Sequence, residues 1–294
     1  MSKCAVIVNR LSGNSRRFSR ETLLAAFGKG FETDFIEINE ETVLDDLTEY
    51  DRLVICGGDG TLNSVLNCAH SPSAEKIYCP SGTLNELATG NSNKDDYLLH
   101  EVGMVGDRLF AYVCACGIFT SLGYVVKNSN KRRYKWLAYL WKVAKLYRIE
   151  DIRATFRTAS HEESGVYTLI MAIDSPKCFG FRFNCMYRLD DGKLHLLAIR
   201  APKRKKLLGA IKVFFPLFRA FFIGFKHEYR SKNMFFVPFD DINIELEQKT
   251  DFCLDGERYP LESSFCVKVH RLPSPLRILL PRTVKKLAKG EYSL

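Results

Sequence analysis

The sequence lacks the marks of zinc-binding, secreted and membrane-spanning proteins. Its ten cysteines form no Cys-x-x-Cys pair or Cys–His cluster, and His161 does not open a His-Glu-x-x-His motif. The N-terminal apolar run is too short for a signal peptide and has no cleavage site of small residues. The most apolar long stretch, 207–225, contains Lys212, Pro216 and Arg219, whereas a spanning helix needs about 20 residues with few or no charges. We therefore expect a cytoplasmic protein whose cysteines are buried free thiols.

Acidic residues are the scarcer of the two charged classes. Forty-three Lys and Arg stand against 34 Asp and Glu, which gives a net charge of +9 over 294 residues. This excess favours an anionic partner, namely a nucleic acid, a nucleotide or an anionic membrane. No recognised nucleic-acid-binding module accompanies the charge, so we expect no nucleic-acid partner. With 46% hydrophobic and 26% charged residues, the chain has the composition of one large globular domain or two ordinary ones.

The first hundred residues alternate short apolar runs with helical patterns. The apolar runs predict strands at 3–9, 33–38, 52–56 and 76–79. The helical patterns cover 20–27 and 62–68, and a third begins at 84. Strands and helices that alternate in this way form a parallel sheet covered on both faces. The sequence therefore predicts a doubly wound α/β domain over 1–100, which we expect the C-terminal segment 272–294 to join.

The pattern changes beyond residue 100. Runs at 101–105 and 108–116 predict a hairpin around Gly106-Asp107. Further strands are predicted at 166–173, 181–187, 193–199, 243–246, 250–254 and 264–270, and helical inserts at 132–147 and 202–225. Asp-Gly turns at 191–192 and 255–256 separate several of these strands. We therefore predict that residues 101–271 form a second domain, a mainly antiparallel β-sandwich.

Three glycine-, hydroxyl- and amide-rich loops follow the ends of predicted strands. They are Asn-Arg-Leu-Ser-Gly at 9–13, Gly-Gly-Asp-Gly-Thr-Leu-Asn at 57–63 and Pro-Ser-Gly-Thr-Leu-Asn-Glu at 80–86. Ligands of open α/β sheets bind outside the carboxyl ends of the strands, so the three loops are expected to converge. Glycines and helix N-termini suit a phosphate group, and Asp59 fits there if a divalent cation lies between it and the phosphates.

The loops match neither the Walker A motif nor the dinucleotide fingerprint, whose third glycine is absent. Gly-Gly-Asp-Gly-Thr, the upstream Asn-x-x-Ser-Gly, the downstream Pro-x-Gly-Thr-x-Asn and the late Asp-Gly-Glu at 255–257 resemble the diacylglycerol kinase catalytic-domain superfamily. Within it, the bacterial soluble lipid kinases are the most similar branch. The resemblance implies a two-domain enzyme that transfers the γ-phosphoryl group of ATP, with Mg²⁺, to a lipid hydroxyl, with ATP held between the domains.

The resemblance also implies roles for individual residues. The nucleotide contacts would be Asn9, Arg10, Leu11, Ser12, Gly13, Asn39, Gly57, Gly58, Asp59, Gly60, Thr61, Leu62, Asn63 and Thr83. Asp255 would be the general base, and Glu257 and Asp59 would join a water network around the catalytic metal. A second Mg²⁺ would take the carboxylate of Asp191 and the carbonyls of Arg188 and Lys193.

Three positions depart from the pattern of the superfamily. Arg10 replaces a usual Pro, Glu86 replaces a usual Asp, and Lys193 lies where an aromatic residue is common. A carbonyl ligand does not depend on its side chain, and Glu86 is one methylene longer than Asp. Only Arg10 therefore bears on the site, where it loosens the first loop and adds charge near the phosphates.

Two stretches, 131–148 and 202–225, combine Lys and Arg with Trp, Tyr and Phe. They suit either an anionic membrane interface or a core with a solvated basic face, and the sequence leaves both open. We predict a kinase of phospholipid biosynthesis that converts diacylglycerol to phosphatidic acid and docks transiently on the inner face of the membrane. The lipid alcohol and the oligomeric state stay open, a homodimer included.

Two alternatives remain. An NAD kinase shares the Gly-Gly-Asp-Gly-Thr motif, but its Thr-Gly-Ser-Thr-Ala-Tyr-like segment is absent. A non-catalytic nucleotide- or lipid-binding regulator need not keep Asp59, Asp255 and Glu257, all of which are present.

Overall fold

The structure is a computed structural model that describes residues 2–13, 17–39, 42, 44, 46–90, 95–118, 151–159, 161–203 and 207–294. It divides into two compact units, Met1–Val102 with His270–Leu294 (unit 1) and Gly103–Val269 (unit 2). The sequence-based boundaries, at 100 and 271, lie within two residues of these. The predicted helix at 132–147 lies outside the described residues.

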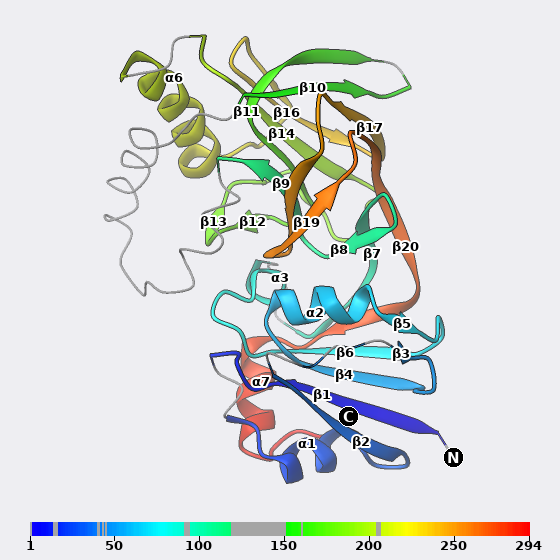
Figure 1. Ribbon diagram of the computed structural model, residues 1–294. Helices are drawn as coiled ribbons and strands as arrows, with labels where there is room; N and C mark the ends of the chain where they lie inside the picture. The colour runs from blue at the N-terminus through cyan, green and yellow to red at the C-terminus, as the bar shows by residue number, and fades with distance from the viewer. Residues whose placement is uncertain are drawn as a thin grey trace. The chain divides into compact units, whose positions relative to one another are not determined.

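Unit 1 is built on a parallel sheet with the strand order β2-β1-β4-β6-β20 (Figure 1). Its strands are β1 (Lys3–Asn9), β2 (Glu32–Ile38), β4 (Arg52–Gly57), β6 (Glu75–Pro80) and the end of β20 (Ser264–Ile278), with a separate pair formed by β3 (Asp46–Leu47) and β5 (Ala69–His70). Its helices are α1 (Arg20–Phe27), α2 (Asp59–Leu66), α3 (Glu86–Gly90) and α7 (Pro281–Ala288). Helices α1 and α7 lie on one side of the sheet and α2 on the other (Figure 1). The predicted doubly wound α/β fold is confirmed.

The inner strands of unit 1, β1, β4 and β6, are buried on both faces because helices cover both faces, whereas the edge strand β2 is exposed or half-buried throughout. On the side of α1 and α7, Val6, Val54 and Ile77 form a buried cluster with Phe27 and Leu287. Helix α1 begins after Ser19, whose hydroxyl oxygen accepts a hydrogen bond of 3.1 Å from the Thr22 N–H and so caps the helix.

Two helices of unit 1 begin elsewhere than the sequence predicts. Helix α2 begins at Asp59, three residues before the predicted 62, directly after the glycine N-cap Gly58. Helix α3 begins at Glu86 instead of 84. Asn85, with φ 46°, is in the left-handed region, so it cannot be part of the helix.

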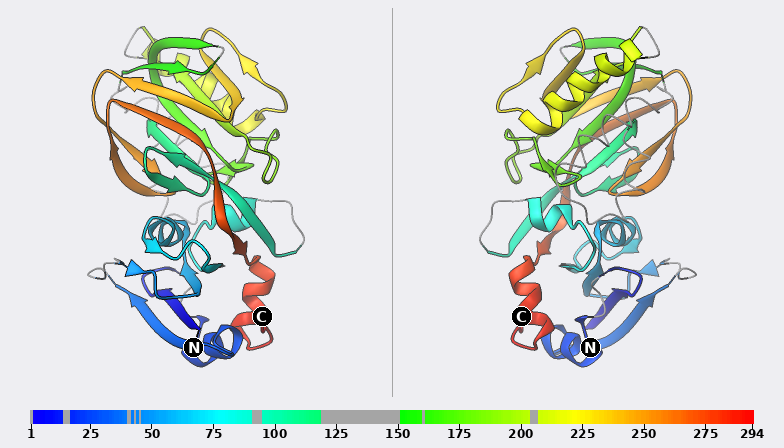
Figure 2. Two further views of the ribbon diagram at one scale, coloured as in Figure 1. Left: turned by 90° about the vertical axis from the view of Figure 1, so that its right-hand side faces the viewer. Right: turned by 90° about the vertical axis from the view of Figure 1, so that its left-hand side faces the viewer.

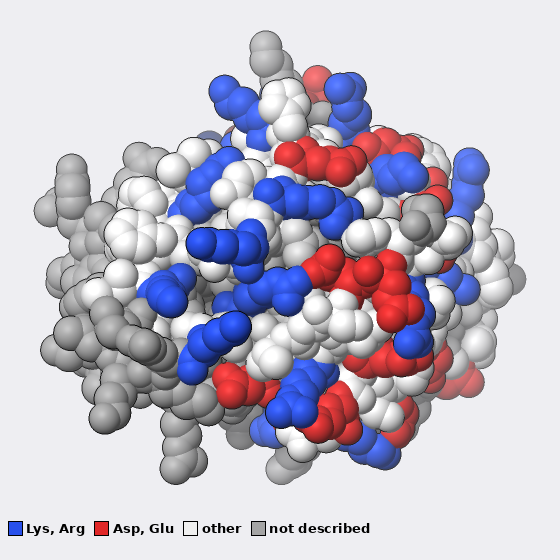
Figure 3. All heavy atoms as spheres, turned by 90° about the horizontal axis from the view of Figure 1, so that it is seen from above, with Lys and Arg blue, Asp and Glu red and all other residues white. Residues whose placement is uncertain are grey.

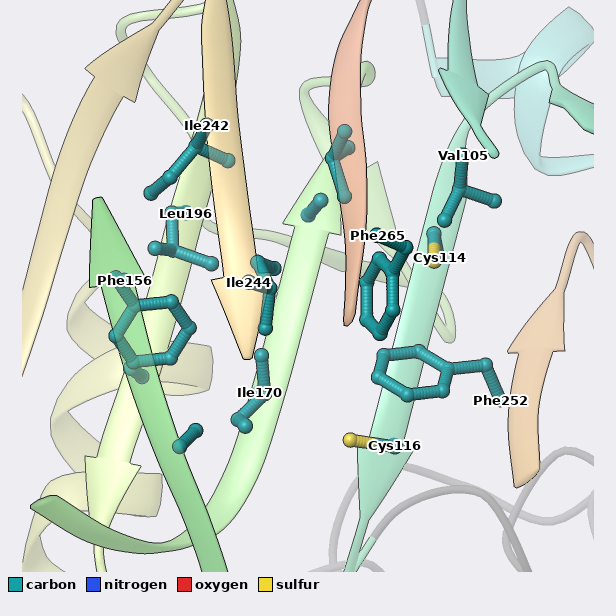
Figure 4. Close-up of a cluster of buried hydrophobic side chains, with 14 of the residues drawn as sticks. Val105, Cys114, Cys116, Phe156, Ile170, Leu196, Ile242, Ile244, Phe252 and Phe265 are labelled. Atoms are coloured by element: carbon teal, nitrogen blue, oxygen red, sulfur yellow. The ribbon is translucent and has the colours of Figure 1, made fainter. Parts of the chain in front are cut away.

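Unit 2 is a mainly antiparallel sheet in the order β15-β16-β14-β11-β10-β17-β20. Strand β9 branches from β11 and continues to β18 and β19, and β7 with β8 branches from β20. Its strands are β7 (Tyr97–Val105), β8 (Arg108–Phe110), β9 (Val113–Gly117), β10 (Ile152–Arg157), β11 (Glu162–Ile173), β12 (Lys177–Cys178), β13 (Phe181–Arg182), β14 (Leu194–Arg200), β15 (Tyr229–Arg230), β16 (Met234–Phe239), β17 (Asp241–Leu246), β18 (Thr250–Leu254) and β19 (Glu257–Leu261). The sheet folds over a buried cluster in which Phe156, Ile170 and Ile244 face Phe252 and Phe265 (Figure 4).

The other face of this sheet is covered by α6 (Leu207–Phe218) and a π-helical turn, η2 (Arg219–Ile223), seen from two sides in Figure 2. Val213, Leu217 and Phe221 pack against Leu197 and Phe236 of the sheet. The predicted helix over 202–225 is therefore present in its central part. Among the described helices, none is both long and apolar enough to cross a bilayer.

The structure corrects the predicted strand at 181–187. Only β13 is a strand, because the Asn184 side-chain oxygen accepts hydrogen bonds from the Met186 and Tyr187 N–H groups and turns the chain. The predicted strand at 108–116 is also broken, between Phe110 and Val113. Strands β10 and β16 were not predicted from the sequence.

Candidate functional site

The second and third glycine loops of unit 1 lie in direct contact. The Gly57 carbonyl accepts hydrogen bonds from the N–H groups of Ser81, at 2.7 Å, and Gly82, at 3.2 Å. A Cβ on Gly82 would lie 2.6 Å from the Gly58 Cα, closer than real Cβ contacts. This backbone approach therefore requires glycine at position 82.

The first loop joins the other two through side chains. The Asn9 amide donates to the Thr61 hydroxyl oxygen at 2.9 Å, and its own oxygen accepts from the Leu11 N–H at 2.9 Å. The Ser12 and Ser81 hydroxyl oxygens lie 3.4 Å apart. The structure thus brings together the three loops at the carboxyl ends of β1, β4 and β6, which are neighbouring strands.

The N-terminus of α2 lies where the three loops meet. The first N–H groups of a helix have no partner within the helix, and Gly58 has no side chain with which to cap them. They also carry the positive end of the helix dipole. This arrangement suits a phosphate or another anion.

Asp59 connects α2 to the neighbouring elements of unit 1. One carboxylate oxygen accepts from the Tyr78 hydroxyl at 3.2 Å, and the other accepts from the Glu86 N–H at 2.8 Å. The second of these bonds caps the start of α3. Sequence reasoning did not identify Tyr78 or Glu86 as partners of Asp59, because nothing in their spacing along the chain indicates the contact.

The remaining predicted nucleotide contacts of the first two loops have different environments. The Arg10 guanidinium donates to a Glu37 carboxylate oxygen of β2, at 2.9 and 3.1 Å. Leu62 is buried in the core, and its N–H donates to the Gly58 carbonyl. The Asn63 side-chain oxygen lies 3.3 Å from the Asn67 amide nitrogen. For Leu62, a direct ligand contact through the side chain is therefore excluded by its burial.

Three further predicted contacts lie at or near the surface of unit 1. Leu11 is exposed. Asn39 follows β2 in a local turn, where its side-chain oxygen accepts from the Thr42 hydroxyl at 2.8 Å. Thr83 is exposed, and a Cβ on Gly13 would lie 3.4 Å from its hydroxyl oxygen. Thr83 therefore lies beside the first loop, as a shared site requires.

Asp255, in unit 2, occupies the Asp-Gly turn between β18 and β19. Its φ is 49° and that of Gly256 is 100°, the two left-handed residues of a tight hairpin turn. The Asp255 side chain is 2% exposed, and its carboxylate accepts three backbone hydrogen bonds. The donors are the N–H groups of Ala111 at 2.5 Å, Tyr112 at 2.9 Å and Val113 at 3.0 Å.

These three bonds explain the break between β8 and β9, because the N–H groups of Ala111 and Tyr112 point to a side chain and not to a strand. They also hold the carboxylate of the predicted general base in one orientation. Glu257, two residues further on, is exposed.

The turn at 188–193 is the predicted second metal site. Asp190 and Gly192 have positive φ values of 52° and 71°, and an Asp191 carboxylate oxygen accepts from the Lys193 N–H at 3.2 Å. The Lys193 ammonium nitrogen lies 3.6 Å from Asp240. Hydrogen bonds from its own backbone and the charge of Lys193 lower the pKa of Asp240. Among the described residues, no group of three or more His, Cys, Asp or Glu is placed to hold a metal ion.

The sequence comparisons show which known proteins unit 1 is similar to. Residues 3–98 match the model of the diacylglycerol kinase catalytic domain. A diacylglycerol kinase of Staphylococcus carnosus is 28% identical over 164 residues, which is 48% of this chain and 53% of that protein. One of Staphylococcus epidermidis is 30% identical over 114 residues, 32% of this chain and 34% of that protein. The matches thus span about half or less of the relatives' own length.

The structural comparison covers more of the chain. The crystal structure of a diacylglycerol kinase from Bacillus anthracis aligns over 96% of this chain and 98% of its own, with a TM-score of 0.61 and 16% identity. At this identity the likeness shows a shared fold. Residues 3–98, which contain the three motif loops, thus match the model of the diacylglycerol kinase catalytic domain, the family that the sequence resembles.

Proposed function

We propose that this chain is an ATP- and Mg²⁺-dependent lipid kinase that converts diacylglycerol to phosphatidic acid. The observation that carries the proposal is the junction of the three loops of unit 1, which lies within the matched family domain. Phosphoryl transfer asks a protein mainly for positioning and for compensation of negative charge. N–H groups at a helix N-terminus, with hydroxyl and amide groups beside them, supply both.

The reaction would proceed by attack of the lipid hydroxyl oxygen on the γ-phosphorus, with ADP as the leaving group and the hydroxyl proton passing to Asp255. A general base must come within about 3 Å of the proton that it takes. The backbone N–H groups of Ala111, Tyr112 and Val113 donate to the Asp255 carboxylate and hold its two oxygens in place. Its fixed orientation supports the role, since the base need not be positioned anew in each turnover.

Magnesium would neutralise charge on the phosphates when it is bound. The turn at 188–193 offers one carboxylate, that of Asp191, and the carbonyls of Arg188 and Lys193. These are hard oxygen donors, the kind that Mg²⁺ takes together with water. The donor set therefore fits a structural Mg²⁺. Asp59 accepts hydrogen bonds from Tyr78 and Glu86, so we expect it to act on a metal through a bridging water.

The direct test is transfer of labelled phosphate from ATP to a panel of lipid alcohols in mixed micelles, with and without a chelator. The panel holds diacylglycerol, a sphingoid base and a polyprenol. We expect labelled phosphatidic acid that depends on Mg²⁺. Label on another alcohol would change the assigned substrate, and turnover of NAD without any labelled lipid would overturn the proposal.

A further inference from the structure

The helix α6 and the turn η2 present two different faces. One face is core, because Val213, Leu217, Ala220 and Phe221 are buried against the sheet of unit 2. Of the two alternatives that the sequence leaves open for this segment, packing in the core is therefore observed for one face of the helix. The question is what the other side contacts.

A row of phenylalanines borders the core face. Phe214, Phe218 and Phe222 are half-buried and stack in sequence, with ring centroids 6.0 and 5.1 Å apart. The ring of Phe181, from β13, lies 5.2 Å from that of Phe222. The row therefore connects the helical segment to β13 beside its core face.

Two apolar side chains point to solvent beyond this row. Phe215 is 64% exposed and Ile223 is 63% exposed, the two highest values among the large apolar side chains that the structure describes. They are eight residues apart on one helical segment, and they lie on the same side of it. Exposed apolar groups grouped on one rigid element indicate an interaction surface.

The segment of chain that forms this surface carries charged side chains of one sign. Residues 193–227 contain nine Lys and Arg and no Asp or Glu. Of these, Lys193, Lys203, Lys212 and Lys226 are described and exposed, while residues 204–206 lie outside the described residues. Figure 3 shows Lys and Arg gathered toward the side where α6 lies in Figure 1, with acidic side chains gathered beside them.

We infer that the outward face of α6 and η2, defined by Phe215, Ile223 and Lys212, docks on an anionic lipid bilayer. Aromatic and aliphatic side chains that enter the headgroup region, with lysines beside them and no acidic residue, are what an anionic interface binds. The inference rests on the proposed function in one respect: a lipid kinase must meet its substrate at such a surface. A protein partner could also bind the exposed apolar side chains, but its binding would not require a cationic segment free of acidic residues.

The test is flotation of the full-length chain with phosphatidylcholine vesicles, prepared with and without phosphatidylglycerol, in the absence of ATP. We expect binding that requires phosphatidylglycerol and weakens as salt is raised. Phe215→Ser and Ile223→Ser should each weaken binding on the order of tenfold, because each removes one inserted apolar side chain. Lys212→Gln should weaken it about fivefold.

Two matched controls carry the same changes elsewhere on unit 2. Val166→Ser removes an exposed apolar group of β11, and Lys268→Gln removes an exposed lysine of β20. Both should bind vesicles as the parent does. Circular dichroism of every variant should match the parent, since the changed side chains are exposed.

The docking inference is overturned if Phe215→Ser and Ile223→Ser float as well as the parent. It is also overturned if light scattering shows a dimer that Phe215→Ser dissociates, since the face would then bind a second copy. The absence of kinase activity on every lipid would refute the proposed function alone, because vesicle binding is measured without nucleotide. If the surface variants lose vesicle binding and the parent phosphorylates a lipid, the results support both the docking inference and the proposed function.

Discussion

Replacing Asp255 by asparagine separates the structural role of its carboxylate from the role of general base that we propose for it. The carboxylate accepts hydrogen bonds from the backbone N–H groups of Ala111, Tyr112 and Val113. Asparagine keeps one oxygen and replaces the other by an NH₂ group, which cannot accept a hydrogen bond. If the remaining oxygen takes the place of the one that serves Tyr112 and Val113, the NH₂ group faces the Ala111 N–H.

The expected cost follows from the number of donors left unpaired. A buried donor without a partner costs about 1–3 kcal/mol, so Asp255→Asn should lower the free energy of unfolding of unit 2 by about 2 kcal/mol. Asp255→Ala leaves three donors unpaired and should lower it by at least about 3 kcal/mol. Both variants should also lose phosphoryl transfer if Asp255 is the general base.

The assay is urea unfolding followed by circular dichroism, combined with nucleotide binding and lipid phosphorylation in the absence of urea. Glu257→Gln is the matched control for stability, because it removes a carboxylate from the same hairpin at an exposed position. We expect it to unfold at the urea concentration of the parent. Asp255→Asn should unfold at a lower urea concentration than the parent, bind ATP through unit 1, and transfer no phosphate.

Two results would refute this reasoning. If Asp255→Asn unfolds with the parent, the three N–H groups do not depend on the carboxylate. If it retains turnover while folded, Asp255 is not the base, and its function is to anchor the turn between β18 and β19.

Two further predictions concern one residue in each unit. Gly82→Ala should weaken ATP binding, measured by calorimetry, and destabilise unit 1 by about 1–3 kcal/mol, because its Cβ would overlap the Gly58 Cα. The control is Gly13→Ala, whose Cβ would come no closer than 3.4 Å to a neighbour and which should leave the stability unchanged. Equal effects of the two variants would count against the close approach of Gly82 to Gly58. Burial lowers the pKa of His195 to about 4 in the folded chain. As the pH falls, His195 is therefore protonated near pH 6.5 in the unfolded chain but only near pH 4 in the folded chain. The free energy of unfolding is thus unaffected by His195 above pH 6.5, and it falls by about 3 kcal/mol between pH 6.5 and 4. Urea unfolding at both pH values should show this loss in the parent, and His195→Gln should lack it.

The convergence of the three loops could be predicted from the sequence because it needs only the strand–helix alternation. Parallel strands end at one edge, so loops that follow β1, β4 and β6 meet whatever the exact register. The boundaries of α2 and α3 could not be predicted in this way, because they depend on backbone conformation. Gly58 is the N-cap of α2, and Asn85, just before α3, has a left-handed conformation.

The hydrogen-bond partners of the acidic motif residues could not be predicted. Asp255 binds N–H groups more than 140 residues away, and Asp59 binds Tyr78 and Glu86 across two strand–helix connections. Such pairs depend on strand register, which no local pattern in the sequence reports. The short β13 illustrates the same limit, because the apolar run at 181–187 predicts a strand that the side chain of Asn184 prevents.

The difference between the partners of Asp59 and those of Asp255 leads to opposite expectations for the same substitution. A tyrosine hydroxyl both donates and accepts, so in Asp59→Asn the new NH₂ group can donate to Tyr78 while the remaining oxygen accepts from the Glu86 N–H. Asp59→Asn should therefore unfold within about 0.5 kcal/mol of the parent, in contrast to Asp255→Asn. A loss of turnover in Asp59→Asn would then be due to the missing charge, and it would support the proposed contribution of Asp59 to holding Mg²⁺. Asp59→Ala is the structural comparison, because it also removes the cap of α3 and should be destabilised by about 1 kcal/mol or more. If Asp59→Asn is as unstable as Asp59→Ala, the hydroxyl of Tyr78 cannot reverse its role, and the charge of Asp59 is needed for the fold.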